Sequence, residues 1–203
     1  NNHFKCCGDG NLDLTDDSDE EKRRYDAINL LKDYIDENLS NQNVIVLGDL
    51  NDDIAEPQIN NVFQLIINDP NYEFVDYQIA LGSSSDWSFP NWPSHLDHIL
   101  VSDELFDELA YSQVETIKLD QYIDGGWNEY DYNISDHRPV FMKLAQNMIL
   151  GDVSGDGSIN ILDVVMIVQI VIGNDEIVQS ADFNSDGYIN ILDVVQLIQI
   201  IIS

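Results

Sequence analysis

The chain has 203 residues, and its 38 acidic side chains far outnumber its 8 lysines and arginines, so the formal net charge is -30. This charge opposes non-specific binding to DNA, RNA and anionic lipid. No apolar stretch reaches the roughly 18 residues that a membrane-spanning helix requires. The length fits one ordinary domain followed by a small one.

In chain order, the apolar spacing predicts helices and strands that alternate through the first three quarters of the chain. Residues 19–39 carry apolar side chains at helical spacing, and residues 44–47 form a short apolar run typical of a strand buried on both faces. A second helix is expected from Pro57 to about residue 67, because proline favours the first turn of a helix. The remaining expected elements are strands at 74–75, 98–101, 111–119 and 139–144, a short helix at 103–109, and loops at 82–95 and 120–134. This mixture predicts an α/β sandwich.

Three short polar motifs each adjoin a predicted strand, and a fourth stands at the start of the chain. They are Gly48-Asp49-Leu50-Asn51, Leu96-Asp97-His98, Ser135-Asp136-His137 and, ahead of them, Asn1-Asn2-His3. Strand ends are where an α/β fold gathers polar groups into one cleft. Asp, Asn and His side chains gathered there can bind a divalent metal, orient a water and stabilise a phosphate. The order of the motifs therefore predicts phosphoester hydrolysis.

Several residues near these motifs have two interpretations. His98 points to the opposite face of its strand from Asp97, so we expect it to be structural. His95 is expected in a loop, with the cleft as the alternative. Cys6 and Cys7 form either a strained vicinal disulfide or two reduced thiols packed under a loop. The aromatic residues of the loop expected at 82–95 either stack on a base or sugar or pack on their own domain; they are Trp87, Phe89 and Trp92.

The character of the sequence changes at Gly151, where a duplicated unit begins. Residues 152–172 and 182–202 are near copies, offset by 30 residues. Each copy has oxygen-bearing residues at positions 1, 3, 5, 7, 9 and 12 of a loop and glycine at position 6, which is the spacing of an EF-hand-type Ca²⁺ loop. Two Ca²⁺ sites are therefore predicted. The expected ligands are Asp152, Ser154, Asp156, Ser158, Asn160 and Asp163 in the first loop, and Asp182, Asn184, Asp186, Tyr188, Asn190 and Asp193 in the second.

Because only one helix is expected after each loop, residues 151–203 resemble a type I dockerin, a pair of loop–helix units that docks onto a cohesin module. The first repeat meets the motif Gly-Asp-x-x-x-Asp-Gly-x-Ile-Asn-x-x-Asp, and the second has Ala181 in place of the leading glycine. We expect this domain to fold only with Ca²⁺, because three aspartates in each loop repel one another without metal. The resemblance implies partner choice by loop positions 10 and 11, with a core between the helices as the alternative. These residues are Ile161, Leu162, Ile191 and Leu192.

Residues 1–149 resemble the C-terminal half of the endonuclease/exonuclease/phosphatase family, whose fold is shared with deoxyribonuclease I. The pieces that carry the resemblance are Asn1-Asn2-His3-Phe4, residues 46–51, residues 96–102 and residues 135–140. The first half of the family normally supplies a metal-binding Glu and an Asn, and neither motif occurs here. We therefore expect either a fragment of a longer chain or a partner that supplies the missing N-terminal half, and no efficient catalysis by this half alone.

The family resemblance also implies a role for each polar motif. His137 would act as the base or the electrostatic group at the attacking water, and Asp97 would hold its imidazole in the right tautomer. Asp136 would help to bind Mg²⁺ or Mn²⁺, and His3 would donate to the phosphate. The water and a phosphate oxygen would be positioned by two further residues, Asp49 and Asn51.

Taken together, the sequence predicts a domain of that family at 1–149 and a dockerin-like domain at 150–203. We expect a secreted, metal-dependent phosphodiester hydrolase, in the first place a nuclease, that is extracellular or at the cell surface. Nucleic acid, nucleotides, phospholipid headgroups and sugar phosphates all remain candidate substrates. The alternative is a catalytically idle structural or adhesive protein that assembles through its dockerin-like end, on a cohesin-like module or on itself.

Overall fold

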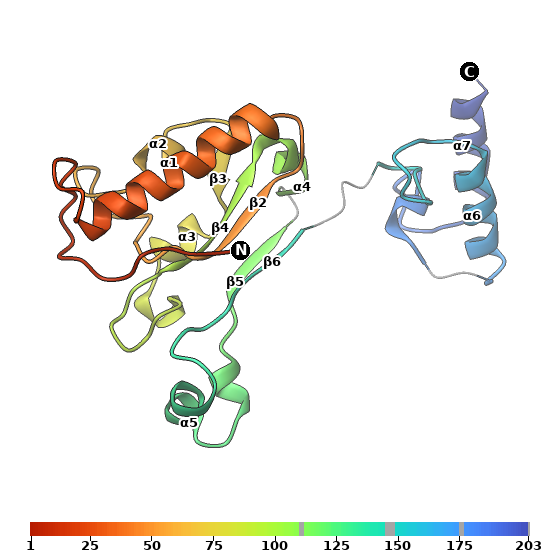
Figure 1. Cartoon of the computed structure of the whole chain (residues 1–203). Coiled ribbons are helices and arrows are strands. Elements are labelled where there is room, and N and C mark those ends of the chain that lie inside the picture. The colour runs from red at the N-terminus through yellow and green to blue at the C-terminus, as the bar shows by residue number, and fades with distance from the viewer. Residues whose placement is uncertain (110–111, 145–148, 175–176, 203) are drawn as a thin grey trace. The chain divides into compact units, whose positions relative to one another are not determined.

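The computed structural model describes residues 1–109, 112–144, 149–174 and 177–202. The chain divides into two compact units, Asn1–Ala145 and Gln146–Ser203. Figure 1 shows strands and helices mixed in the first unit and a pair of helices in the second. None of the described helices is both long enough and apolar enough to cross a membrane.

A four-stranded sheet forms the centre of the first unit, with the strand order β1-β2-β4-β3. β1 runs parallel to β2, and the other two pairings are antiparallel. The register places His3 beside Asp49, and Asp49 opposite Asp97. One end of three neighbouring strands therefore carries three of the predicted site residues. The strands are β1 (Asn2–His3), β2 (Ile45–Asp49), β3 (Tyr72–Phe74) and β4 (Asp97–Ser102).

Helix α1 (Glu20–Asn38) covers one face of this sheet (Figure 1). Its buried side chains Ile28 and Ile35 pack in one core with Val46 of β2 and Leu100 of β4. The helix confirms the prediction for residues 19–39, because the apolar positions recur every three or four residues and face the sheet.

A two-stranded antiparallel sheet of β5 (Gln113–Thr116) and β6 (Val140–Lys143) provides the second layer. Val140 and Met142 pack on Ile99 and Val101, which point away from α1. Beside this contact, a hollow of about 530 Å³ is lined by residues of β2, β4 and β6. The prediction that residues 44–47 are buried on both faces was wrong for Ile45 and Leu47, which share one face and are 38% and 42% exposed.

The short helices differ most from the sequence-based expectations. The helix expected from Pro57 to residue 67 is reduced to its last turn, and turns form at residues 58–60 and 62–63. A helix forms at Gly126–Asn133, where a loop was expected, because Tyr130 is buried and stacks on Trp127. The short α-helices are α2 (Gln64–Ile67), α3 (Tyr77–Ala80), α4 (Phe106–Leu109) and α5 (Gly126–Asn133). The 3₁₀ turns are η1 (Ser84–Asp86), η2 (Asp103–Leu105), η3 (Leu119–Tyr122) and η4 (Gln179–Ala181).

The second unit consists of two similar loop–helix pairs, with helices α6 (Ile161–Val171) and α7 (Ile191–Ile201). Each helix begins with a capping box, in which an asparagine and an aspartate three residues later bond to each other's backbone amides. Ile167 and Leu197 are fully buried between the helices. One helix therefore follows each acidic loop, as predicted.

Candidate functional site

The hydrogen bond between His137 and Asp97 is the centre of the candidate site. His137 Nδ1 lies 2.6 Å from Asp97 Oδ2, and the ring of Phe89 lies against the imidazole at 4.9 Å between centroids. The hydrogen bond to Asp97 raises the pKa of His137, although burial works in the opposite direction. Further negative charge on Asp49 and Asp136 adds to this increase. The geometry is that of a histidine whose tautomer is fixed by a carboxylate.

Asp49 lies next to this pair at the end of β2. Its Oδ2 is 4.0 Å from His137 Nε2 and 3.5 Å from His3 Nε2. Burial raises the pKa of the Asp49 carboxyl, and so does the neighbouring charge of Asp97. Ligand atoms of Asp49, Asp97 and His137 all lie within 4.8 Å of one another. The structure therefore brings residues from three separate motifs to one point, which two carboxylates and an imidazole equip to hold a divalent cation.

Asn51 and Asp136 differ in how closely they approach this point. Asn51 has a left-handed backbone (φ 57°), and its amide N–H donates to Asp49 Oδ1 at 3.0 Å. Its side-chain Nδ2 donates to the carbonyl of Phe4 at 3.2 Å, so Asn51 also fastens the N-terminal segment. Asp136 is exposed and, within the described part of the chain, lies outside the cluster of possible ligands.

A second polar cluster, fully buried on the α1 side of β4, was not predicted as a unit. Asp76 Oδ2 lies 2.6 Å from His98 Nδ1 and 3.0 Å from His95 Nε2, while Asp76 Oδ1 accepts the Ile99 amide. His98 is structural, as the sequence predicted, and His95 is buried rather than lining a cleft. Although burial opposes it, the Asp76 charge raises the pKa of His98.

The buried cluster does not fit a metal ion. His95 Nδ1 accepts a hydrogen bond from the Ser88 amide, so its proton is on Nε2 and is directed to Asp76. His98 uses both ring nitrogens, because Nε2 contacts the Asp52 carbonyl at 2.8 Å. These interactions leave no imidazole lone pair for a cation. The cluster instead stabilises β4, the strand that begins at Asp97 of the candidate site, because Asp76 accepts a hydrogen bond from the Ile99 amide of that strand.

The loop before β4 connects the two clusters. Ser88 Oγ accepts hydrogen bonds from the backbone amides of Leu96 and Asp97, each at 3.1 Å, and these bonds fix the start of β4. Trp87 packs within its own unit and donates to the Ile79 carbonyl. Trp92, by contrast, is 79% exposed. Of the three aromatic residues considered for substrate contact, only Phe89 touches a predicted site residue through a ring contact that the structure describes.

The two acidic loops of the second unit have matching internal contacts. Asp152 and Asp182, at position 1, each accept a hydrogen bond from the backbone amide of the glycine at position 6. Asp163 and Asp193, at position 12, are fully buried and bind backbone amides at both ends of their loops. Although burial opposes it, these amide hydrogen bonds lower the pKa of Asp163. The remaining predicted ligands lie at the partly or fully exposed side of each loop; they are Ser154, Asp156, Ser158, Asn160, Asn184, Asp186, Tyr188 and Asn190.

The residues at loop positions 10 and 11 are exposed. The exposed fractions are 66% for Ile161, 49% for Leu162, 58% for Ile191 and 54% for Leu192. The alternative of a core between the helices is therefore wrong for these four residues. Cys6 and Cys7 are also exposed, and the structure has them as free thiols rather than as thiols packed under a loop.

Two family models match the sequence. The model of the Endonuclease/Exonuclease/phosphatase family matches residues 7–137, and the model of the Dockerin type I domain matches residues 150–202. The first match is longer than half of the chain and contains Asp49, Asn51, Asp97 and His137, whereas His3 precedes it. No curated protein and no solved structure matches the chain.

Proposed function

The chain belongs to the endonuclease/exonuclease/phosphatase family and carries a type I dockerin domain, and from this premise we propose that it is a metal-dependent phosphodiester hydrolase with a calcium-dependent docking module. The observation that carries the proposal is the convergence of Asp49, Asp97 and His137 within 4.8 Å. We propose that the catalytic domain, residues 1–149, has the sandwich fold of deoxyribonuclease I. We also propose that the protein acts outside the cell or at its surface, where dockerin domains typically occur.

In this proposal, His137 acts on the phosphate and the attacking water. It would serve there as the general base or as the electrostatic group, and the hydrogen bond to Asp97 raises its pKa. Asp97 orients the ring through Nδ1 and leaves Nε2 directed toward Asp49. His3 is the second imidazole beside Asp49, and its 74% exposed side chain can donate to a phosphate oxygen.

The residues present fit a divalent cation. Two carboxylates lie side by side, and the charge of Asp97 contributes to the raised pKa of Asp49, which is a repulsion that a cation relieves. Carboxylate oxygens are the ligands that Mg²⁺ and Mn²⁺ prefer. We propose that Asp49 and Asp97 hold the ion and that Asp136 contributes from the edge of the site. The ion would neutralise phosphate charge and lower the pKa of a bound water.

The proposed activity is tested on the longest native chain that contains this sequence, with Mg²⁺ or Mn²⁺ present. Bis(p-nitrophenyl) phosphate reports on the chemistry, and plasmid DNA reports on nuclease activity. We expect His137→Ala and Asp49→Ala each to lower turnover by a factor of about 100 or more, whereas Asp86→Ala, in an ion pair at the surface, leaves it unchanged. Wild-type turnover in both variants, or no metal-dependent turnover in the native chain, contradicts the proposal.

The docking function is tested separately. We propose that both acidic loops bind Ca²⁺ through the side chains and carbonyls at their six ligand positions, and that the exposed apolar residues at positions 10 and 11 bind a cohesin module. Leu162→Asp and Leu192→Asp should abolish Ca²⁺-dependent capture on an immobilised cohesin. Both side chains are about half exposed, so the helices should remain intact by circular dichroism. Capture that survives both changes, or that ignores chelation, refutes this assignment.

A further inference from the structure

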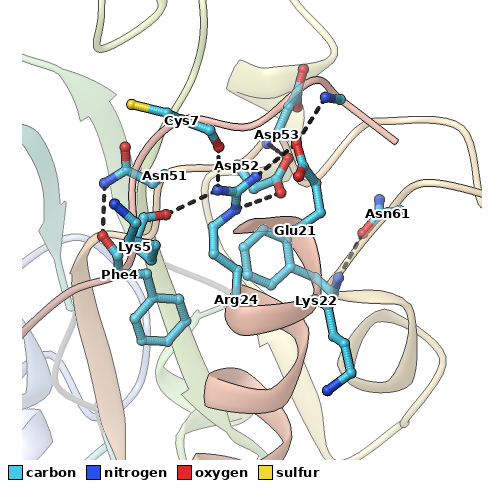
Figure 2. A network of polar contacts seen from close by, with 12 residues as sticks. Phe4, Lys5, Cys7, Glu21, Lys22, Arg24, Asn51, Asp52, Asp53 and Asn61 are labelled. Carbon is cyan, nitrogen blue, oxygen red and sulfur yellow. Dashed lines mark hydrogen bonds and ion pairs between the residues drawn. The ribbon is translucent and has the colours of Figure 1, made fainter. Parts of the chain in front are cut away.

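Arg24 is almost completely buried in α1, with 3% of its surface exposed, and every nitrogen of its guanidinium group has a partner. Nε donates to Asp52 Oδ2 at 2.8 Å. Nη1 donates to two backbone carbonyls, those of Lys5 at 2.9 Å and Cys7 at 2.6 Å. Nη2 lies 3.4 Å from Glu21 Oε1. Figure 2 shows this guanidinium group where the N-terminal segment, the loop after β2 and α1 meet.

The two segments that Arg24 joins carry predicted site residues. Lys5 and Cys7 follow His3, and Asp52 follows Asn51 directly. The same two segments also bind each other, because Asn51 Nδ2 donates to the Phe4 carbonyl (Figure 2) and the Phe4 amide donates to the Asp49 carbonyl. Arg24 thus supplies a third connection, from the helix, to the place where these two segments cross.

The local structure needs such a connection. β1 has two residues and lies at the edge of its sheet, where, among the described strands, it pairs only with β2, so its ladder holds the N-terminal segment weakly. Asn51 adopts a left-handed backbone, which persists only where surrounding contacts determine it. Asp52 is held from two sides, by Arg24 at its carboxylate and by His98 at its carbonyl. These contacts fix the backbone on the C-terminal side of Asn51.

We propose that Arg24 is a positioning residue, which holds the segments of His3 and Asn51 in the geometry of the candidate site. The planar guanidinium group reaches acceptors in three directions at once, and a lysine ammonium group at the same place cannot reach them all. Its charge also pairs with two buried carboxylates, those of Glu21 and Asp52. The consequence for turnover rests on the proposed hydrolase function, whereas the structural part of the inference does not.

The kinetic test compares Arg24→Lys with Arg23→Lys, its exposed neighbour on the same helix. Turnover of bis(p-nitrophenyl) phosphate is normalised to the folded fraction. We expect Arg24→Lys to lower kcat at least tenfold with KM changed less than threefold, because the substrate still binds while His3 and Asn51 are misplaced. Arg23→Lys should match the wild type. An unchanged kcat per folded Arg24→Lys molecule overturns the inference.

A second measurement does not depend on activity. Amide hydrogen exchange of the full chain should accelerate at least tenfold at Phe4 and Asn51 in Arg24→Lys, but not in α6 or α7. Where Arg24→Lys does not fold, Asp52→Asn provides the same test with a milder change. Unchanged exchange at both amides overturns the inference, whatever the activity shows. If exchange accelerates but the protein has no hydrolase activity at all, the structural role of Arg24 stands and only the proposed function is refuted.

Discussion

The buried carboxylate of Asp76 provides a quantitative test of how the candidate site is supported. Asp76 is fully buried and accepts hydrogen bonds from His98 Nδ1, His95 Nε2 and the Ile99 amide. Asp76→Asn keeps the shape of the side chain but removes the charge that pairs with His98. It also replaces one acceptor oxygen by an NH₂ group, so either the two imidazoles at Oδ2 or the Ile99 amide at Oδ1 loses its acceptor.

The cost follows from the burial of both partners. Breaking a buried ion pair by removing one partner costs about 3–5 kcal/mol, and here neither side chain has any exposed surface. We expect a loss of about 4 kcal/mol, which is a large part of the roughly 5–15 kcal/mol that stabilises a typical domain. For a domain of this size, the corresponding fall in Tm is roughly 10–15 °C.

The pH dependence of this loss has a definite sign. The pKa of His98 is raised, so its contribution to stability is complete below its unfolded pKa of about 6.5 and is lost as the pH rises through the folded pKa. The pKa of Asp76 is lowered, mainly by the His98 charge against the effect of burial, so its contribution is present above about pH 4 and is lost in acid. The difference between wild type and Asp76→Asn should therefore be largest between about pH 4 and 6.5.

Denaturant unfolding followed by tryptophan fluorescence measures this difference. All three tryptophans, Trp87, Trp92 and Trp127, lie in the first unit, so the signal reports on that unit. Asp86→Asn removes an aspartate from a partly exposed pair with Lys118 and is the control, with an expected cost below about 1 kcal/mol. The reasoning is refuted if Asp76→Asn costs no more than this control, or if its cost is independent of pH.

Three further predictions concern Glu56, the acidic loops and the position-12 aspartates. Burial and a hydrogen bond to Asp52 raise the pKa of Glu56 to about 9, so stability is lost as the pH rises from the unfolded value toward 9. Glu56→Gln should therefore gain about 1–2 kcal/mol over wild type between pH 5 and pH 8, since half exposure reduces the full effect; a gain that does not change with pH contradicts this. Chelation of Ca²⁺ should abolish the helical circular dichroism of α6 and α7 while tryptophan fluorescence stays constant, and an unchanged spectrum would refute coupled folding. Asp163→Ala should weaken Ca²⁺ binding by at least tenfold in calorimetry, and Ser185→Ala should not. Equal Ca²⁺ affinities of the two variants would show that Asp163 neither binds the ion nor stabilises the loop.

Much of the candidate site could be predicted because it follows from local sequence patterns. Asp49 follows one apolar run and Asp97 precedes another, so antiparallel pairing of the two strands places both residues at the same end of the sheet. The duplicated loops were equally clear, because ligand spacing and a glycine recur together. The position of α1 followed from its apolar period. In each of these cases, neighbours in the sequence carry the information.

The remaining features depend on contacts between distant segments. Nothing around Arg24 or Asp76 in the sequence distinguishes them from surface charges, and only the folded chain shows that both are buried against opposite charges. α5 contains one glycine, two asparagines and two tyrosines, which are poor helix formers, and the buried ring of Tyr130 stabilises it. The apolar residues 44–47 could not reveal that β6 packs on β4 and leaves part of β2 exposed.

The most direct test of the central claim is the turnover of a phosphodiester by Asp97→Asn in the presence of Mn²⁺. The substitution keeps the size of the side chain, but it removes the carboxylate that lies 2.6 Å from His137 Nδ1. If Asp97, His137 and Asp49 form one hydrolytic site, kcat should fall by a factor on the order of 10,000, as expected when the tautomer of a catalytic histidine is lost. Turnover equal to that of the wild type would contradict the account.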